Sequence, residues 1–192
     1  MNSYISDIDK NTLRIALPLI LSNITIPLVG FVDNVAMGQL GSAIYIGAVG
    51  LGAIIISFIL FSFGFIKSIT VSFTSQHTGE NKRNALLISL YQILIISSSI
   101  SLAIILFREQ IIHTVLSYMG GSAEVKANTK IYLDYRIWSV PAIFLRDILI
   151  GYYIGIQKTR IAMVISIFIT ILNALLDYYF IFILHFGIEG VA

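Results

Sequence analysis

Long apolar runs, separated by short polar stretches, constrain this chain more than any other feature of its sequence. A helical run of about 20 apolar residues matches the hydrocarbon thickness of a lipid bilayer. Charged residues make up only 11% of the chain, against about 25% in soluble domains, and the mean hydropathy is +0.92. So few charges cannot cover a water-facing surface. We therefore predict an integral membrane protein.

The runs predict an all-α membrane protein, a helical bundle with five complete transmembrane spans and the start of a sixth. A polar tail, residues 1–12, precedes the first span, and the apolar run after it is too long for a cleavable signal peptide. Residues 108–121 are too short and too charged to span, which predicts an amphipathic interfacial helix. The expected spans are residues 13–37, 46–73, 85–107, 127–156 and 161–184, with the sixth beginning at 187.

Basic residues are unequally divided between the two sets of loops. Cytoplasmic loops of membrane proteins carry an excess of Lys and Arg, so the N-terminal tail is predicted to be cytoplasmic. The side that includes this tail carries Lys10, Arg14, Lys82, Arg83, Lys158 and Arg160, and the opposite side carries Arg108, Lys126 and Lys130.

The sequence offers no motif for enzymatic chemistry. It contains no phosphate-binding glycine loop and no HExxH pattern, so neither an ATPase nor a protease is expected. It has no cysteine, and its three histidines fall near loops without the spacing of a metal site. A net charge of +2, with dispersed basic residues, does not suggest nucleic acid. The expected partners are the lipid bilayer and a small-molecule substrate, with no cofactor.

Two aspartates interrupt apolar runs, and an intramembrane carboxylate is costly enough to need a reason. At a rise of 1.5 Å per residue, Asp33 lies about 30 Å beyond Leu13, and Asp177 about 25 Å beyond Arg160, so both reach a similar depth. Asn173 shares a helical face with Asp177, four residues later. An amide can donate to a charged carboxylate or accept from a protonated one. The alternative is that both aspartates are solvated at the membrane edge.

Arg146 and Asp147 interrupt the fourth span about ten residues before its end, near the middle of the membrane. Adjacent residues on a helix point about 100° apart, so each is expected to find its own partner or a wet cavity. The alternative is structural pairing between helices. Tyr178 is a candidate for a cavity lining, with a lipid-facing role as the alternative.

Several segments resemble one transporter family in the same order along the chain. Residues 13–41 look like the first helix of multidrug and toxic compound extrusion (MATE) transporters, and more closely like its DinF-like branch. Pro18 and Asp33 match the family's early proline with an aspartate fifteen residues on. Further similarities lie in the cytoplasmic segments 75–85 and 155–160, the Asn-to-Asp motif 173–177, and the helix-six entry 187–192.

The resemblance implies that residues 13–192 are the N-terminal lobe of a two-lobed, twelve-helix antiporter in the bacterial cytoplasmic membrane. Such a protein exports organic cations or amphipathic compounds in exchange for H⁺ or Na⁺. The resemblance carries the coupling-ion role, including a Na⁺ site, to Asp33, Asn173 and Asp177, and it marks Pro18 as a helix kink. The second lobe is expected in another chain or absent.

Two rival functions stay open. One is a lipid-linked saccharide flippase of related architecture, which a broadly cationic cavity would favour. The other is a non-transporting or truncated membrane subunit, which the chain length of 192 residues favours. From this length we expect the chain by itself to give no drug efflux.

Overall fold

The computed structural model describes residues 2–38 and 43–191; within the first helix, the side chains of residues 2–8, 11, 25–27, 29–30, 33–34 and 36–37 lie outside the described part. Every regular element in the described residues is helical, as predicted. Its helices are α1 (Asn2–Gly38), α2 (Ala43–Ser62), α3 (Phe65–Gly79), α4 (Arg83–Leu106), α5 (Arg108–Tyr118), α6 (Ala123–Arg136), α7 (Val140–Gly155) and α8 (Thr159–Tyr178), with three short elements η1 (Ile137–Ser139), η2 (Tyr179–Ile183) and η3 (Ile188–Val191).

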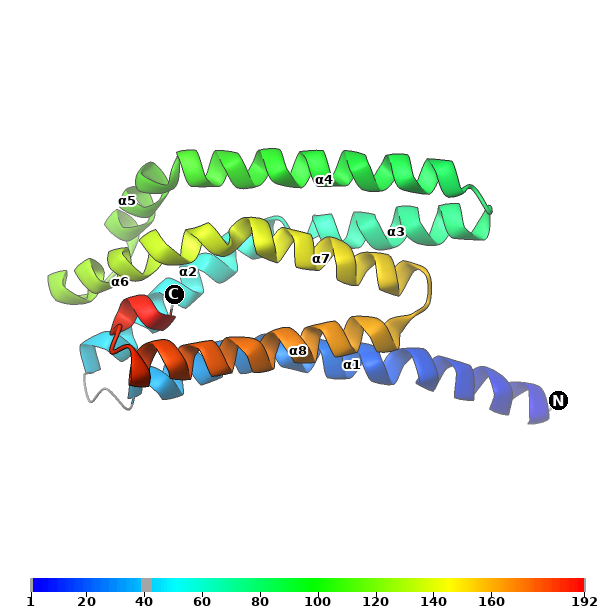
Figure 1. The fold of residues 1–192 in the computed structure, drawn as a ribbon, viewed down its shortest axis with the longest axis horizontal. Helices are drawn as coiled ribbons and strands as arrows, with labels where there is room; N and C mark the ends of the chain where they lie inside the picture. Colours follow the sequence, from blue (N-terminus) through cyan, green and yellow to red (C-terminus); the bar gives the residue numbers. More distant parts are fainter. Residues whose placement is uncertain (1, 39–42, 192) are drawn as a thin grey trace.

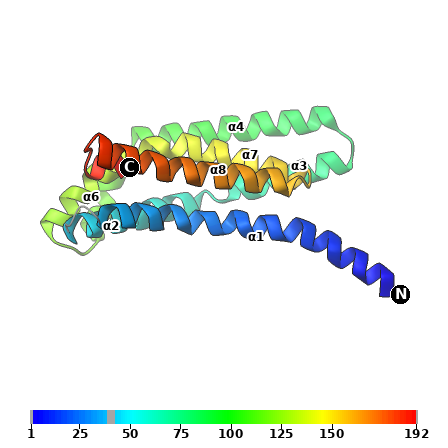
Figure 2. The same ribbon diagram turned by 60° about the horizontal axis from the view of Figure 1, so that its bottom comes forward.

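The long helices form an elongated bundle. In Figure 1, α4 forms one edge, α3 and α7 lie in the middle, and α1 and α8 form the opposite edge. The α3–α4 and α7–α8 turns lie at the same end as the N-terminus, whereas α5 and the start of α6 lie at the other end. Figure 2 shows the N-terminal part of α1 extending beyond the rest of the bundle.

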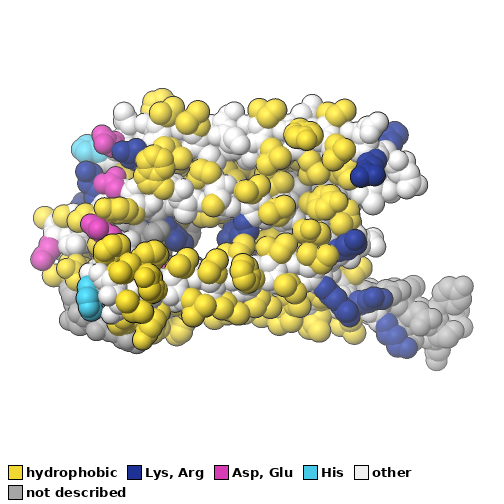
Figure 3. All heavy atoms as spheres, in the orientation of Figure 1, with side chains coloured by type: hydrophobic (Ala, Val, Ile, Leu, Met, Phe, Trp, Pro, Cys, Tyr) yellow, Lys and Arg dark blue, Asp and Glu magenta, His cyan; other side chains and the backbone are white. Residues whose placement is uncertain are grey.

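Four stretches of the described chain are helical, long and apolar enough to cross a membrane: Ala43–Gly79, Arg83–Leu106, Ala123–Gly155 and Thr159–Ile183. Figure 3 shows hydrophobic side chains along the sides of the molecule, with most charged ones at its two ends. The predicted first span falls in α1, where many side chains lie outside the described part. The exact span limits, the interfacial place of α5 and a sixth span after 187 stay predictions.

Two of the predicted continuous spans are broken helices. The span 46–73 divides between α2 and α3, where the N–H groups of Phe63 and Gly64 bond three residues back, to Leu60 and Phe61. These tight bonds replace the regular α-helical pattern. The span 127–156 changes to a 3₁₀ turn, η1, before α7 begins. Helix α7 begins at Val140, and Pro141 lies in its first turn, where its missing N–H leaves no helical bond unmade.

Small residues allow α3 and α7 to approach closely. A Cβ atom built at Gly155 would lie 2.6 Å from the Cβ of Thr74, and one at Gly151 would lie 2.9 Å from the Cβ of Thr70. Both threonines are fully buried. Helices in lipid gain little from apolar burial against each other, so close van der Waals packing at small residues holds them together.

Helix α2 offers a matched pair of substitutions that tests its packing. A Cβ at Gly52 would overlap the ring of Tyr132, which is buried in α6, whereas a Cβ at Gly50 meets nothing within 4 Å. Overpacking of this kind costs about 1–3 kcal/mol, so G52A is expected to lower the thermal unfolding temperature of the purified chain in detergent. G50A should not lower it. Equal effects of the two changes would contradict the α2–α6 packing.

Candidate ion-coupling groove between α1 and α8

A groove of about 250 Å³ lies between α1 and the end of α8. The described residues of its α1 wall are apolar, and its other wall includes the carboxylate-bearing turn of α8. The groove is lined by Phe31, Val32 and Val35 of α1 and by Ala174, Asp177, Tyr178 and Phe182 of the α8–η2 segment. Among the described residues of this lining, Asp177 is the only charged one.

Asp177 is only 4% exposed, so its carboxylate faces the protein interior. It sits in the last turn of α8, directly before the π-helical element η2. Such π-helical turns occur frequently at functional sites. A carboxylate that is merely solvated at the membrane edge does not fit this burial, because burying a charge costs free energy unless it is paired or neutralised. Burial therefore argues against the solvated alternative for Asp177, and its ion-coupling role stays a prediction.

Asn173 lies one turn before Asp177 on α8 and is half-buried. Its side-chain oxygen Oδ1 is buried and accepts no hydrogen bond from the described residues. A buried acceptor without a donor costs about 1–3 kcal/mol. A protonated carboxyl group or a hard cation that prefers oxygen ligands would satisfy this atom.

Asp33 belongs to α1, but its side chain lies outside the described residues. Its neighbours Val32 and Val35 line the groove that Asp177 enters from α8. The α1 segment around position 33 is therefore next to the Asp177 groove. A shared cavity for the two carboxylates, and a Na⁺ site that includes Asn173, stay predictions.

A pair of serines that sequence reasoning missed joins the same two helices. Ser22 is 4% exposed, and its hydroxyl lies 2.7 Å from that of Ser166 in α8, forming a hydrogen bond. Pro18, one turn before Ser22, is buried, and α1 continues through it as a helix. A kink at Pro18 stays a prediction. The only available signal for the serine pair was two isolated hydroxyls within apolar runs.

The prediction of separate partners for Arg146 and Asp147 is wrong. Asp147 Oδ1 accepts hydrogen bonds from Arg146 Nε at 3.0 Å and from Nη2 at 2.8 Å, so the two residues pair with each other. Their Cα–Cβ directions do diverge on the helix, but the long aliphatic stem of arginine lets the guanidinium reach back. Neither residue lines the α1–α8 groove, whereas Tyr178 does.

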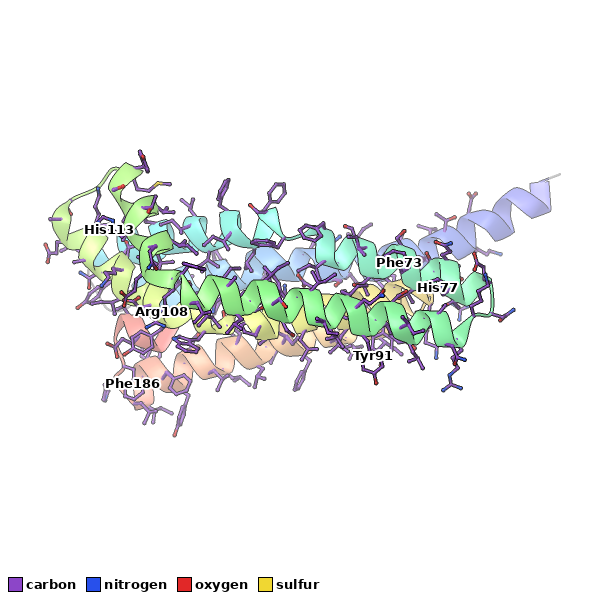
Figure 4. The ribbon with its side chains drawn as sticks, turned by 90° about the horizontal axis from the view of Figure 1, so that it is seen from above. Phe73, His77, Tyr91, Arg108, His113 and Phe186 are labelled. Carbon is purple, nitrogen blue, oxygen red and sulfur yellow. The ribbon has the colours of Figure 1, made fainter. Side chains whose placement is uncertain are left out.

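The histidines do not gather into a site. Figure 4 places His77 and His113 towards opposite ends of the molecule. His77 stacks on Phe73 with ring centroids 6.0 Å apart, and its Nε2 lies 3.1 Å from the hydroxyl of Ser89, which links α3 to α4. Within the described residues, no group of three or more His, Cys, Asp or Glu side chains is placed to hold a metal ion.

Comparisons with known proteins agree with this architecture. The MatE family model matches residues 18–179. The DNA damage-inducible protein F of Escherichia coli strain K12 is 34% identical over 190 residues, which are 99% of this chain and 41% of the relative. The multidrug resistance protein NorM of Vibrio cholerae is 29% identical over 176 residues, which are 90% of this chain and 37% of the relative.

Solved structures share the fold at lower sequence identity. A crystal structure of MATE in the bent conformation superposes with a TM-score of 0.87 over 96% of this chain and 41% of that chain, at 21% identity. An outward-facing multidrug resistance MATE family transporter of the MOP superfamily gives 0.84 over 95% and 40%, also at 21% identity. The chain thus spans about two fifths of the length of these proteins. With a family model that covers most of its residues and with this fold, the chain belongs to the MATE family of multi-pass membrane transporters.

Proposed function

We propose that this chain is the N-terminal lobe of a cation-coupled multidrug efflux antiporter, driven by H⁺ or Na⁺. The observation that carries the proposal is the buried carboxylate of Asp177 in the α1–α8 groove. Family membership supports it, since relatives include proteins described as multidrug resistance proteins. The α8 wall of the groove belongs to Thr159–Ile183, a stretch that is long and apolar enough to cross a membrane.

In the proposed cycle, the coupling ion neutralises Asp177. A charged carboxylate needs donors around it, whereas a neutralised one can accept closer apolar packing from Val32 and Val35 of α1. Ion binding would thereby change how α1 packs against α8 near Asp177. The Ser22–Ser166 hydrogen bond would keep the two helices in contact elsewhere along their length. One charge that crosses about 100 mV supplies about 2.3 kcal/mol, or roughly a fifty-fold substrate gradient.

A chimera tests the proposal directly. Residues 1–192 replace the matching N-terminal region of the V. cholerae NorM protein, and ethidium retention is measured in a strain that lacks efflux pumps. We expect the chimera to lower retention and collapse of the ion gradient to restore it. The 192-residue chain expressed by itself should leave retention unchanged, because it spans under half of its relatives. A well-inserted chimera without gradient-driven export would contradict the antiporter assignment.

A second function has one observation in its favour. Basic side chains border an opening in the middle of the molecule in Figure 3, and a cationic cavity suits an anionic, lipid-linked saccharide. The same chimera separates the two functions by cargo charge. Export of ethidium but not of an anionic dye such as carboxyfluorescein supports the multidrug antiporter, and the reverse result supports the flippase.

Topology provides an independent prediction. The Lys and Arg bias places the N-terminus and the loops near Lys82 and Lys158 in the cytoplasm, and the segment near Gly187 outside. Single cysteines can be introduced at these positions without background, because the chain has no cysteine of its own. An impermeant maleimide added to intact cells should label position 187 but not position 82 or 158. Labelling of position 82 would reverse the topology.

A further inference from the structure

A basic depression lies where α8 begins beside α1. It has a volume of about 210 Å³ and is lined by Arg14 of α1 together with the turn and first residues of α8, namely Gln157, Lys158, Thr159, Arg160 and Ile161. Figure 3 shows basic side chains gathered at this end of the molecule. Three cationic residues from two separate parts of the sequence therefore meet at one hollow.

No acidic side chain in the described part of the chain neutralises these three residues. The ion pairs found there are Lys82–Glu80, Lys130–Asp134 and Arg146–Asp147. Glu80 lies at the same end of the bundle, but it is already occupied: Lys82 Nζ lies 2.9 Å from its carboxylate, and this hydrogen-bonded charge lowers the pKa of Glu80. The depression thus keeps a strong positive charge.

The backbone adds to this charge. Helix α8 begins at Thr159, its N-cap residue Lys158 makes no side-chain cap hydrogen bond, and the first residues of the helix line the hollow. The N-terminus of a helix carries a partial positive charge and unused N–H donors. Together with Arg14 and Arg160, these donors suit a phosphate group.

The surroundings favour a lipid phosphate over a soluble one. Exposed apolar side chains begin directly beside the basic residues on both helices: Leu13 and Leu17 flank Arg14, and Ile161 and Val164 follow Arg160. A ligand that fits this surface carries an anionic head and apolar tails, in the manner of a phospholipid at the water–lipid boundary. Lys10, exposed one turn before Arg14, extends the positive charge towards water.

We propose that Arg14, Lys158 and Arg160 bind the phosphate headgroup of an anionic phospholipid in the leaflet at the N-terminal end of the bundle. The lipid would bridge α1 to the start of α8, the two helices that form the ion-coupling groove at their other ends. It would therefore stabilise the contact between α1 near Arg14 and the first turn of α8. This lipid site does not depend on which ion or cargo the transporter uses.

Thermal unfolding of the 192-residue chain in detergent, titrated with phosphatidylglycerol or with phosphatidylcholine of the same acyl chains, tests the proposal. Phosphatidylglycerol should stabilise the chain at lower concentration than phosphatidylcholine. Each basic residue near an anionic headgroup contributes about a five-fold effect, so R14Q/R160Q should weaken phosphatidylglycerol binding roughly 30-fold. The control K126Q/K130Q removes the same charge at the opposite end and should leave this binding unchanged.

Three results would overturn the proposal: equal stabilisation by both lipids, equal losses in the two double variants, or the same stabilisation by inorganic phosphate added to the chain in detergent with phosphatidylcholine. The last result would identify a site for free anions. If R14Q/R160Q does not fold, K158Q serves in its place, because Lys158 is exposed in the turn before α8. That variant should weaken phosphatidylglycerol binding about five-fold, and an unchanged affinity would count against the site.

Discussion

Replacing Asp177 with asparagine is expected to abolish ion-driven export by the NorM chimera while the protein still inserts and folds. Asparagine keeps the shape of the side chain but can neither bind a proton nor carry the charge that attracts Na⁺. Because one coupled charge supports roughly a fifty-fold gradient at about 100 mV, the accumulation ratio should fall from that level towards one. The measurement is ethidium transport into inverted membrane vesicles after an imposed pH or Na⁺ gradient.

A matched control separates the site from a general effect of losing a carboxylate. Asp134 lies in α6 in a weak pair with Lys130, whose Nζ is 3.9 Å from its carboxylate, and it is partly exposed. D134N should therefore export at the unmodified rate.

D33N is expected to behave as D177N does, and N173L should weaken coupling because it removes the buried oxygen beside Asp177. Gradient-driven export that survives in D177N would place the coupling ion elsewhere in the protein.

Breaking the Arg146–Asp147 pair is expected to give the largest loss of stability. The two groups are 29% and 21% exposed, and a charge left alone at the middle of a span costs about 2.5–3.5 kcal/mol on insertion scales. D147N leaves Arg146 without its counter-charge, and R146M leaves Asp147 without its own. Each single variant should therefore give less folded protein and a lower unfolding temperature in detergent.

The double variant R146M/D147N distinguishes a structural pair from a functional one. With both charges removed, no uncompensated charge remains in the span, so stability should return close to that of the unmodified chain. Export by a stable double-variant chimera would assign the pair a structural role. Loss of export at restored stability would instead assign Arg146 or Asp147 to transport. A double variant as unstable as the sum of the single ones would contradict the pairing.

Membrane residence and helical structure followed from the sequence because both depend on local properties. The length of an apolar run and the scarcity of charge can be counted along the chain, and a run in lipid must satisfy its backbone hydrogen bonds within itself. The spacing of Asn173 and Asp177 on one helical face is equally local. The apolar pattern of residues 127–156 predicts one continuous span, whereas the structure changes to the 3₁₀ turn η1 before α7, because packing with other helices decides where a helix is interrupted.

Tertiary structure alone decided which polar groups are buried and with whom. Asp177 could have faced lipid, water or protein from its sequence position; its burial depends on α1, which is contributed by residues more than a hundred positions away. The Ser22–Ser166 hydrogen bond depends on the same helix pairing. The prediction of separate partners for Arg146 and Asp147 was wrong for a different reason. The Cα–Cβ directions of adjacent helical residues diverge, but the length and flexibility of the arginine side chain decide where its charge lies. The hydrophobic pattern of the sequence determines which segments enter the membrane. The contacts between helices that are distant in the sequence determine which polar side chains are buried and which groups they meet.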